Sequence, residues 1–350
     1  MLQLTCPPRD RTSSYPDGRK AGRLTMADMT DSRKKLVAIG ELLVDFVPGE
    51  PGISVRQAES FQRAAGGAPA NAAAAAALLG AEASFIGRVG ADAFGAYLRD
   101  TLAGFGVDTS GVVTDPERAT TLAFVSLAAD ADRDFVFYRD GTADTRLEPA
   151  DLPDSLIRSA AVLHFCSISL SREPARGTTF EAVRWAAAAG ALISFDLNWR
   201  APLWSGTSEA LPLLRRAAAE AHILKLSEEE LELLTGSAGT SAAAELLGGR
   251  TQVVLVSRGA RGLSLFSGNR QSDVPAFPVM PVDTTGAGDA LAGAFLGQLA
   301  EGTARPGDHS GLVAAARRAA AAAALSTRKP GAMPSYPSLA ELEAFLDAES

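Results

Sequence analysis

The sequence contains few cysteine and histidine residues. Its two cysteines, Cys6 and Cys166, lie far apart in the chain. A disulfide framework is therefore not expected, and this usage is typical of a reducing compartment such as the cytoplasm. The three histidines show no metal-ligand spacing, so the pattern predicts no metal site built on them.

A membrane span and a basic surface are also missing. No apolar run approaches the roughly 20 residues that cross a bilayer, which argues against a membrane partner. The formal net charge is −8, and an acidic chain offers no basic face for nucleic acid. Any anion must therefore be bound in a local pocket.

Two common phosphate-binding motifs do not occur either. The sequence has no G-x-x-x-x-G-K-[ST] loop, and no G-x-G-x-x-G follows a predicted strand in the context of dinucleotide binding. A Walker-type loop and a Rossmann-type phosphate turn are thus excluded. Phosphate binding would have to use a simpler turn with free backbone amides.

The first residues differ in character from the rest. Residues 1–34 mix Pro, Arg, Asp, Ser and Thr without periodicity and lack the apolar stretch of a secretory signal. We expect them to form a disordered N-terminal arm. The whole chain is 47% hydrophobic and 21% charged, and residues 35–350 suffice for one large domain with an appendage.

Strand-like and helix-like segments alternate along residues 35–350. The clearest strand-like runs are AVLHFCSISL, ALISFDLNW, AHILKLS and TQVVLVSRG. Such alternation predicts an α/β protein of three α/β/α layers, with a central mostly parallel sheet and a ligand site at the carboxyl ends of the strands. An earlier run, from Leu36 to Val47, is interpreted as a buried strand followed by polar interruptions.

Two segments fit the main sheet poorly. The runs TTLAFVSLA and RDFVFYRD alternate apolar with polar residues and have no helix between them. This pattern predicts an antiparallel hairpin. We expect residues 41–60 and 118–140 to form a small β lid.

The string DTTGAGD, residues 283–289, carries the clearest chemistry. Its Gly286-Ala287-Gly288 turn exposes backbone amides at a predicted helix start, where a transferred phosphoryl group would be stabilised. Asp289 lies one step into the helix and can accept a proton from a hydroxyl nucleophile. An Asp that only caps the helix is the better interpretation of an isolated GxGD, whereas the full string favours the catalytic one.

Taken together, these pieces resemble the ribokinase-like (pfkB) carbohydrate kinases, and within them the fructokinases. DTTGAGD resembles the C-terminal signature of that family, and GGAPANAAAAAALLG resembles its N-terminal signature. The similarity runs from about Leu36 to Pro337 and includes GELLVDFVP, FIGRVGADAFG, FYRDGTAD, DLNWR and VSRGARG. It implies a ribokinase-like fold with a β lid.

The resemblance assigns one group of residues to the sugar and the reaction. Asp289 would be the general base, and the amides of Gly286, Ala287 and Gly288 would form the anion hole. Further positions match those that bind sugar hydroxyls: Asp45, Gly66, Gly67, Asn71, Arg139 and Ser167. Taken alone, Asp45 fits a strand-end turn and Asn71 a helix cap. Arg139 would reach from the lid toward the substrate or the moving phosphate.

A second group is assigned to the nucleotide and metal ions. The matching nucleotide positions are Asn198, Arg200, Lys225, Ser257, Gly259 and Gly262, together with Gly286 and Gly288. Magnesium is assigned to Glu230, through water, although Ser227 replaces the Asn of the related N-x-x-E stretch. Asp283 and Thr285, with carbonyls near residues 326–331, resemble a potassium site.

These assignments imply transfer of the ATP γ-phosphate to a sugar, with fructose as the expected acceptor. Ala68 stands where ribokinases have a lysine, which favours fructokinase. Kinases for 2-keto-3-deoxygluconate, ribose or a nucleoside stay open as alternatives. So does a sugar-binding regulatory homologue without turnover. A homodimer formed through the β lid is the expected assembly.

Overall fold

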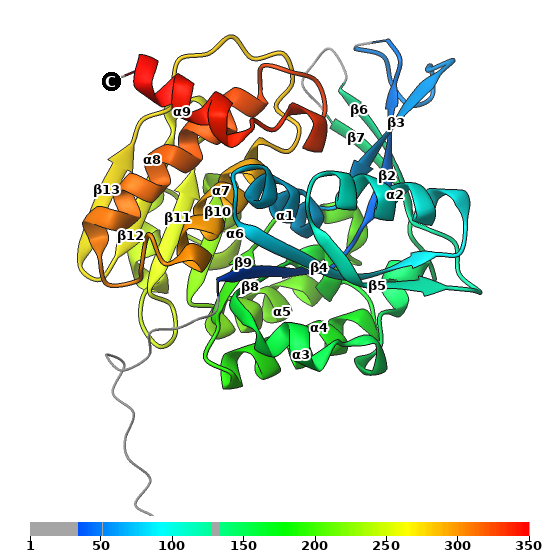
Figure 1. Ribbon diagram of the computed structural model, residues 1–350, viewed down its shortest axis with the longest axis horizontal. Coiled ribbons are helices and arrows are strands. Elements are labelled where there is room, and N and C mark those ends of the chain that lie inside the picture. The colour runs from blue at the N-terminus through cyan, green and yellow to red at the C-terminus, as the bar shows by residue number, and fades with distance from the viewer. Residues whose placement is uncertain (1–33, 51, 128–132, 350) are drawn as a thin grey trace, which may run out of the picture. The chain divides into compact units, whose positions relative to one another are not determined.

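A nine-stranded sheet forms the centre of the computed structural model, which describes residues 34–50, 52–127 and 133–349. Its strands are β1 (Lys35–Ile39), β4 (Glu82–Gly90), β5 (Asp108–Asp115), β8 (Ala160–Cys166), β9 (Leu192–Asp196), β10 (Ile223–Ser227), β11 (Val253–Ser257), β12 (Leu263–Ser267) and β13 (Arg270–Val274). The order across the sheet is β13-β12-β11-β10-β9-β8-β1-β4-β5 (Figure 1). Neighbouring strands are parallel except at the pairs β11–β12 and β12–β13, so the predicted mostly parallel sheet is confirmed.

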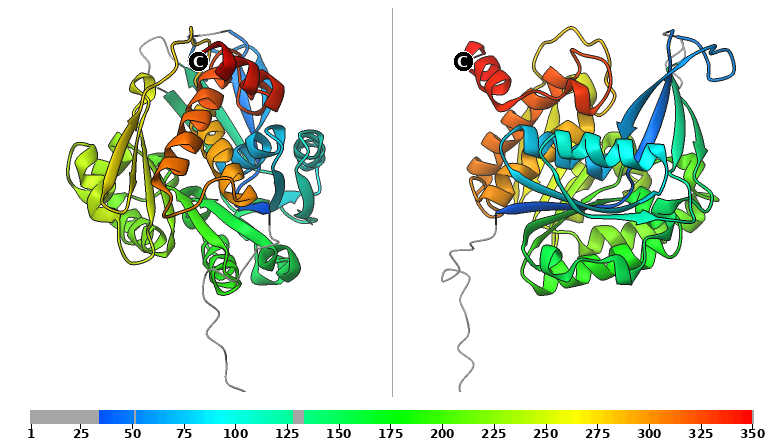
Figure 2. Two further views of the ribbon diagram at one scale, coloured as in Figure 1. Left: turned by 60° about the vertical axis from the view of Figure 1, so that its left-hand side comes forward. Right: turned by 45° about the vertical axis from the view of Figure 1, so that its right-hand side comes forward.

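Helices cover both faces of this sheet. On one face lie α1 (Ala68–Leu78), α2 (Ala93–Gly104), α7 (Ala287–Glu301) and α8 (His309–Ser326), with α9 (Leu339–Ala348) packed outside α8. On the other face lie α3 (Asp154–Arg158), α4 (Ala175–Ala188), α5 (Thr207–Glu220) and α6 (Glu228–Thr235). Figure 2 shows the green helices opposite the orange ones, with the sheet between them. The three-layer prediction is therefore confirmed.

The strands are apolar because both of their faces are covered. Leu36, Val37, Ala38 and Ile39 of β1 are all fully buried. Their side chains alternate between two hydrophobic clusters, one beneath α1 and α7 and the other beneath α4 and α5. The order of strands reverses beside β1, where chain connections leave in opposite directions. Ligand sites of open α/β sheets form outside the carboxyl ends of strands at such a point.

A second, four-stranded sheet is built from β2 (Leu43–Pro48), β3 (Phe61–Gly66), β6 (Leu122–Leu127) and β7 (Arg133–Tyr138), in the order β3-β2-β6-β7. The strands β6 and β7 pair antiparallel, as the sequence pattern predicts. The strand β3 extends this sheet to residue 66, beyond the segment 41–60 that the sequence suggested for the lid.

The run from Leu36 to Val47 is two strands of different sheets rather than one. The chain leaves β1 at Gly40, where φ is 154°, and enters β2 three residues later. A Cβ atom at Gly40 would lie 2.6 Å from both the Pro69 ring and the Ser169 hydroxyl. The change of sheet therefore requires glycine at this position.

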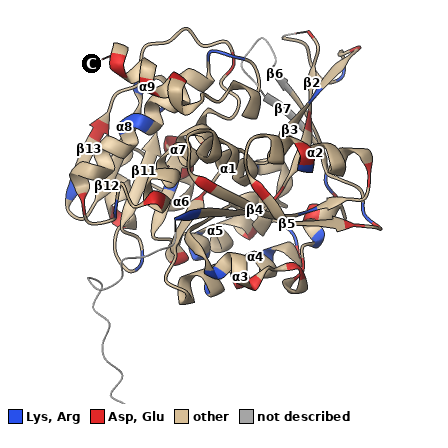
Figure 3. Ribbon diagram, viewed as in Figure 1, with Lys and Arg blue, Asp and Glu red and all other residues tan. Residues whose placement is uncertain are grey.

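Charged residues of both signs are interspersed over the described ribbon (Figure 3). Among the described residues, none of the helices is both long and apolar enough to span a bilayer. The arm predicted for residues 1–34 falls, apart from Lys34, outside the described residues.

Candidate active site

The turn before α7 is fixed by close contacts. Gly286 adopts the left-handed conformation, with φ at 75°, and a Cβ atom there would lie 2.6 Å from that of Ala332. The Tyr336 hydroxyl donates to the Gly286 carbonyl at 3.2 Å. These contacts fix the turn from which α7 begins, and the N-terminus of a helix favours an anion.

The three amides of this turn are not equivalent. The Ala287 amide donates to the Thr284 carbonyl at 3.3 Å. Within the described part of the chain, no backbone carbonyl accepts from the amides of Gly286 or Gly288. An anion bound here would therefore use Gly286 and Gly288 first and would compete with Thr284 for Ala287.

Asp289 lies in the first turn of α7, between two asparagine side chains. Asn71, near the start of α1, donates from Nδ2 to Asp289 Oδ2 at 2.8 Å. Asn198 donates from Nδ2 to Oδ1 at 3.4 Å. Burial raises the pKa of Asp289 to about 6, against the lowering effects of Lys225 and of the Asn71 hydrogen bond. A carboxylate with this pKa is ionised near neutral pH and suited to accept a proton.

The amide oxygens of both asparagines lack partners. Asn71 Oδ1 and Asn198 Oδ1 are buried and accept no hydrogen bond from the described residues. Because buried polar atoms are nearly always paired, such atoms indicate a missing polar ligand. The two asparagines are thus held by Asp289 on one side and are available to a ligand on the other.

Asp45 and the glycines predicted to bind sugar form one tight cluster. A Cβ atom at Gly66 would lie 2.1 Å from Asp45 Oδ2, so the carboxylate occupies the space that a side chain would take. Gly67 has φ at 110°, and its Cβ would lie 2.3 Å from the Glu41 carbonyl. Burial, opposed by the charge of Arg200 and assisted by that of Asp289, raises the pKa of Asp45 to about 7. Asp45 and Asp289 therefore share one electrostatic environment.

Glu41 belongs to this cluster, although the sequence analysis did not select it. Its side chain is 1% exposed. Its Oε1 accepts from the Ala68 amide at 3.0 Å, and its Oε2 accepts from the Ser169 hydroxyl at 3.4 Å. Burial raises the pKa of Glu41 to about 7. A single acidic residue inside the apolar run VAIGELLV was the available signal.

Arg139 is buried rather than extended into solvent. It follows β7 and is 5% exposed. Its Nε donates to Asp144 at 2.7 Å and its Nη1 to the Ser171 hydroxyl at 2.7 Å, whereas Nη2 has no partner among the described residues. The guanidinium group is thus held at the base of the small sheet with one donor free.

Ser167 lies in the 3-10 turn after β8 rather than in the strand. Its hydroxyl donates to the Asn198 carbonyl at 3.2 Å. Asn198 itself has φ at 39°, an unusual value for a residue other than glycine. Ser167 therefore supports the strained turn that carries Asn198.

A buried ion pair lies next to the turn formed by residues 286–288. Lys225 Nζ donates to Asp196 Oδ2 at 2.7 Å, and a Cβ atom at Gly288 would lie 3.2 Å from the same nitrogen. Burial alone would lower the pKa of Lys225, but the carboxylates of Asp196 and Glu230 raise it above its ordinary value. A permanent positive charge is thus fixed beside the amides of the turn.

Glu230 has a structural role that the sequence analysis underestimated. Its Oε2 accepts from the Ser227 amide at 2.8 Å in a capping box, and its Oε1 accepts from the Trp199 amide at 2.6 Å. Burial raises the pKa of this carboxyl. Each oxygen keeps a second lone pair, which fits a water-mediated contact to magnesium better than direct coordination.

Three of the positions predicted to bind the nucleotide, Ser257, Gly259 and Gly262, line one pocket beside the turn. Its volume is about 490 Å³. The lining includes Ser257, Gly259, Gly262, Phe277, Ala287, Gly288 and Leu291. Most of these surfaces are apolar or backbone, which suits a flat heterocycle next to a phosphate group. Arg200, which the sequence analysis also assigned to the nucleotide, does not line this pocket, and its charge lowers the pKa of both Asp45 and Asp289.

Asp283 joins two loops at the predicted potassium site. Its Oδ1 accepts from the amide and hydroxyl of Thr285 at 2.9 and 2.7 Å, and its Oδ2 accepts from the Gly331 amide at 2.8 Å. Among the described residues, no group of three His, Cys, Asp or Glu side chains is placed to hold a metal ion. A cation here would therefore depend on backbone carbonyls.

The fold has three layers, and its site places a carboxylate in the first turn of a helix, with a polar cluster and an apolar pocket nearby. These features are typical of a kinase that acts on a small polar molecule. Residues 33–339 match the pfkB family of carbohydrate kinases, and the chain belongs to that family.

Known relatives support this membership. Fructokinase-1 of Zea mays is 42% identical over 316 residues, covering 90% of this chain and 98% of its own. The fructokinase of Xylella fastidiosa with bound ATP superposes with a TM-score of 0.83 at 34% identity, covering 91% of this chain and 99% of its own.

Two further structures contain ions. A fructokinase double mutant of Vibrio cholerae O395 with fructose, ADP and potassium has a TM-score of 0.80 at 34% identity, covering 91% of this chain and all (100%) of its own. A putative ribokinase II of E. coli with ATP and magnesium has a TM-score of 0.81 at 30% identity, covering 90% and 99%.

Proposed function

We propose that this chain transfers the γ-phosphoryl group of ATP to a hydroxymethyl oxygen of fructose, giving fructose 6-phosphate and ADP. The observation that carries the proposal is the position of Asp289. Its carboxylate is held by Asn71 and Asn198, whose amide oxygens are buried and accept no hydrogen bond from the described residues. Its helix begins with two amides that have no backbone acceptor within the described residues. The names of the Zea mays and Xylella fastidiosa relatives support fructose as the acceptor.

In the proposed reaction, the sugar hydroxyl attacks the terminal phosphorus while its proton passes to Asp289. The bond from that phosphorus to the bridging oxygen breaks, and ADP leaves. The amides of Gly286 and Gly288 and the ammonium group of Lys225 stabilise the charge on the transferred group. Catalysis arises from positioning and electrostatics, because the protein forms no covalent intermediate.

The proposed site has one part that binds the sugar and another that binds ATP. Asp45, Gly66, Gly67 and Asn71 bind the sugar hydroxyls, and Arg139 directs its free Nη2 donor to the sugar or the phosphate. The base of ATP occupies the pocket beside Gly262, and its phosphates pass Asn198 and Lys225.

Two ions complete the proposal. Glu230 would hold magnesium through water, and the ion would supply positive charge to neutralise the phosphates of a bound nucleotide. Asp283 and Thr285, with the carbonyls of residues 326–331, would hold potassium. The E. coli structure with magnesium and the Vibrio cholerae structure with potassium support both ions.

We also propose a cytoplasmic homodimer that pairs through the small sheet, which acts as a lid. Tyr138 is 62% exposed and Val136 is 36% exposed on β7. Exposed apolar side chains on a sheet of this kind favour burial against a partner.

Light scattering tests the homodimer and should give twice the chain mass. Tyr138→Glu combined with Val136→Glu should give a monomer. A monomeric wild-type chain contradicts this part of the proposal.

A sugar panel tests the activity. The purified chain, ATP and magnesium are incubated with fructose, ribose, a nucleoside or 2-keto-3-deoxygluconate, and ADP release is measured. We expect the highest kcat/KM with fructose. Turnover of ribose or 2-keto-3-deoxygluconate far above that of fructose overturns the acceptor, and binding of fructose without ADP release indicates a regulatory homologue.

A further inference from the structure

The helices α1 and α7 lie side by side against the same face of the sheet (Figure 1). The helix α1 carries no charged residue and consists mainly of alanine (Figure 3). The helix α7 presents glycine at positions 293 and 297. Because small residues let two helix backbones approach closely, this pair is packed more tightly than leucine side chains would allow.

The contacts between the two helices form a ladder with steps of four residues. At its first step, Asn71 donates to Asp289 at 2.8 Å. At the second step, a Cβ atom at Gly293 would lie 2.2 Å from the Ala72 carbonyl oxygen and 2.8 Å from the Ala75 Cβ. Asp289 and Gly293 lie on one face of α7, since residues four apart are neighbours along a helix.

We propose that Gly293 is a positioning residue, which lets the α7 backbone approach α1 closely enough to hold Asp289 within hydrogen-bond distance of Asn71. This inference rests on the proposed role of Asp289 as the base. The obstacle to any side chain at 293 is a backbone carbonyl, which cannot rotate away as a side chain does. A methyl group there must therefore separate the helices next to the catalytic pair.

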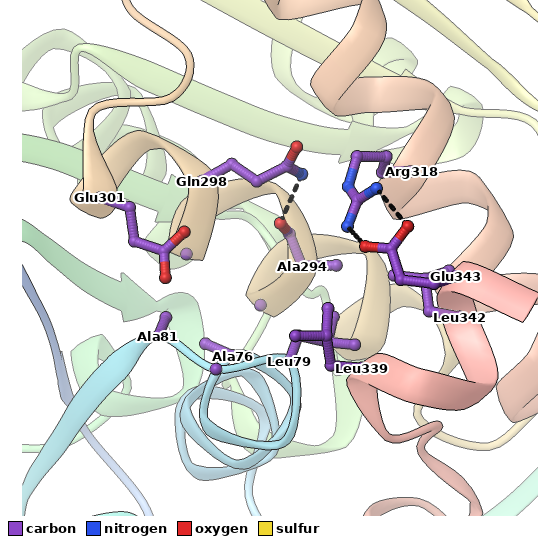
Figure 4. A pocket seen from close by; sticks show the side chains of 13 residues that line it. Ala76, Leu79, Ala81, Ala294, Gln298, Glu301, Arg318, Leu339, Leu342 and Glu343 are labelled. Carbon is purple, nitrogen blue, oxygen red and sulfur yellow. Dashed lines mark hydrogen bonds and ion pairs between the residues drawn. The ribbon is translucent and has the colours of Figure 1, made fainter. Parts of the chain in front are cut away.

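The third step of the ladder is looser. A Cβ atom at Gly297 would lie 3.1 Å from the Ala81 Cβ and 3.6 Å from the Ala76 Cβ, with no backbone oxygen among these contacts. A pocket of about 310 Å³ opens here, and Figure 4 shows Ala76 and Ala81 at its edge, opposite Gln298 and Glu301. A methyl group at 297 requires Ala81 to move by only a few tenths of an ångström, so Gly297→Ala is a matched control with the same gain in helix propensity.

Separation of the two helices should change the pKa of Asp289. The Asn71 hydrogen bond favours the ionised form of Asp289, so its loss raises the pKa of that carboxyl. The other charged or titratable groups that act on Asp289 stay in place: Asp45, Cys166, Asp196, Arg200, Lys225 and Tyr336. A general loss of stability would not move the pH profile in this direction.

The test compares Gly293→Ala with Gly297→Ala. For Gly293→Ala we expect kcat/KM for fructose to fall roughly ten- to a hundredfold, and the acid limb of the pH profile to move up by roughly one pH unit. Gly297→Ala should keep both close to wild type. In an Asn71→Ala background, Gly293→Ala should give no further shift of the acid limb.

Three results overturn the inference: equal effects of the two substitutions, an unchanged acid limb in Gly293→Ala, or a shift that persists without Asn71. If Gly293→Ala does not fold, Ala75→Val adds volume to the same contact from α1. Fructose binding by calorimetry reports the same geometry without turnover, and Gly293→Ala should weaken it. A wild-type chain that binds fructose but releases no ADP ends the proposed function, while this binding comparison still decides the role of Gly293.

Discussion

Lys225 and Asp196 face each other on neighbouring strands and form an ion pair of 2.7 Å, with 10% and 1% of their side chains exposed. The pair fixes the lysine ammonium beneath Gly288, in the turn that would bind the transferred phosphoryl group. A buried charge without a partner is costly, so Asp196 makes this location of the lysine possible.

Replacing Asp196 should therefore destabilise the chain and impair nucleotide use. We expect Asp196→Asn to lower the free energy of unfolding by about 3–5 kcal/mol and to raise KM for ATP. Chemical denaturation and initial-rate kinetics measure the two effects. The exposed pair of Arg158 and Asp154 gives the control, because Arg158→Ala should cost less than about 1 kcal/mol. Equal losses in the two variants contradict the role of the buried pair.

Replacing the proposed base should separate turnover from binding. Asp289→Asn keeps the size of the side chain and removes its ability to accept a proton. We expect kcat to fall by roughly 10²–10⁴-fold, with fructose affinity changed only a few-fold. ADP release and calorimetry measure these quantities, and unchanged turnover would rule out Asp289 as the base.

Activity should fall as the pH is lowered toward 6. Burial raises the pKa of Asp289 to about 6 and that of Asp45 to about 7. Asp289 must be ionised to accept a proton, so kcat/KM should rise with pH through this range and level off above about 7. Asp45→Asn should leave one transition near 6, at lower fructose affinity. A flat profile from pH 5 to 8 contradicts this prediction.

The same shifts have the opposite sign for stability. Both carboxyls have folded pKa values above the ordinary 3.8, so the folded state binds their protons more tightly than the unfolded state does. Their favourable contribution is complete below pH about 4 and is lost as the pH rises through 7. Denaturation of Asp45→Asn at pH 8 should accordingly show a gain of about 0.5–2 kcal/mol over wild type.

A methyl group at Gly66 should act on the sugar alone. A Cβ atom there would lie 2.1 Å from Asp45 Oδ2 and must displace the carboxylate. We expect Gly66→Ala to raise KM for fructose roughly tenfold or more, because a small displacement of a substrate-binding group has a large effect. KM for ATP should not change. Gly104→Ala in α2 is the control, since nothing lies within 4 Å of its Cβ position. A rise in KM for ATP instead of fructose would contradict the assignment of Gly66 to the sugar.

A methyl group at Gly262 should have the converse effect. Gly262 has φ at 88°, and its Cβ would lie 2.1 Å from the Val274 carbonyl oxygen, beside the nucleotide pocket. We expect Gly262→Ala to raise KM for ATP and leave fructose binding intact. Gly268→Ala also places an alanine at a positive φ, of 57°, but its Cβ meets no atom within 4 Å. Equal kinetics in the two variants would show that backbone strain, rather than the pocket, causes the effect.

The periodic part of the fold could be predicted from sequence because each strand of the α/β region is covered on both faces. β8 to β11 are continuous apolar runs, and the helices between them are long enough to show their period. The antiparallel strands β12 and β13 were missed. β12, with the sequence LSLFS, is interrupted by serines, and the edge strand β13, with the sequence RQSDV, is mostly polar. Edge strands of this kind lack a clear hydrophobic signal.

Other features depend on contacts between distant residues. The break at Gly40 is required by Pro69 and Ser169, which no local pattern reveals. The partner of Glu41 is the amide of Ala68, 27 residues later in the chain. Glu230 belongs to the acidic run EEELE, and its contact with the amide of Trp199, 31 residues earlier in the chain, could not be predicted from that run.

The short connection at residues 40–42 links two sheets that each carry one acidic group of the site. Asp45 belongs to the small sheet, whereas Asp289 belongs to a helix on the main sheet. A molecule that touches both carboxylates connects the two sheets. Binding of such a molecule would therefore restrict any movement of the small sheet against the main sheet.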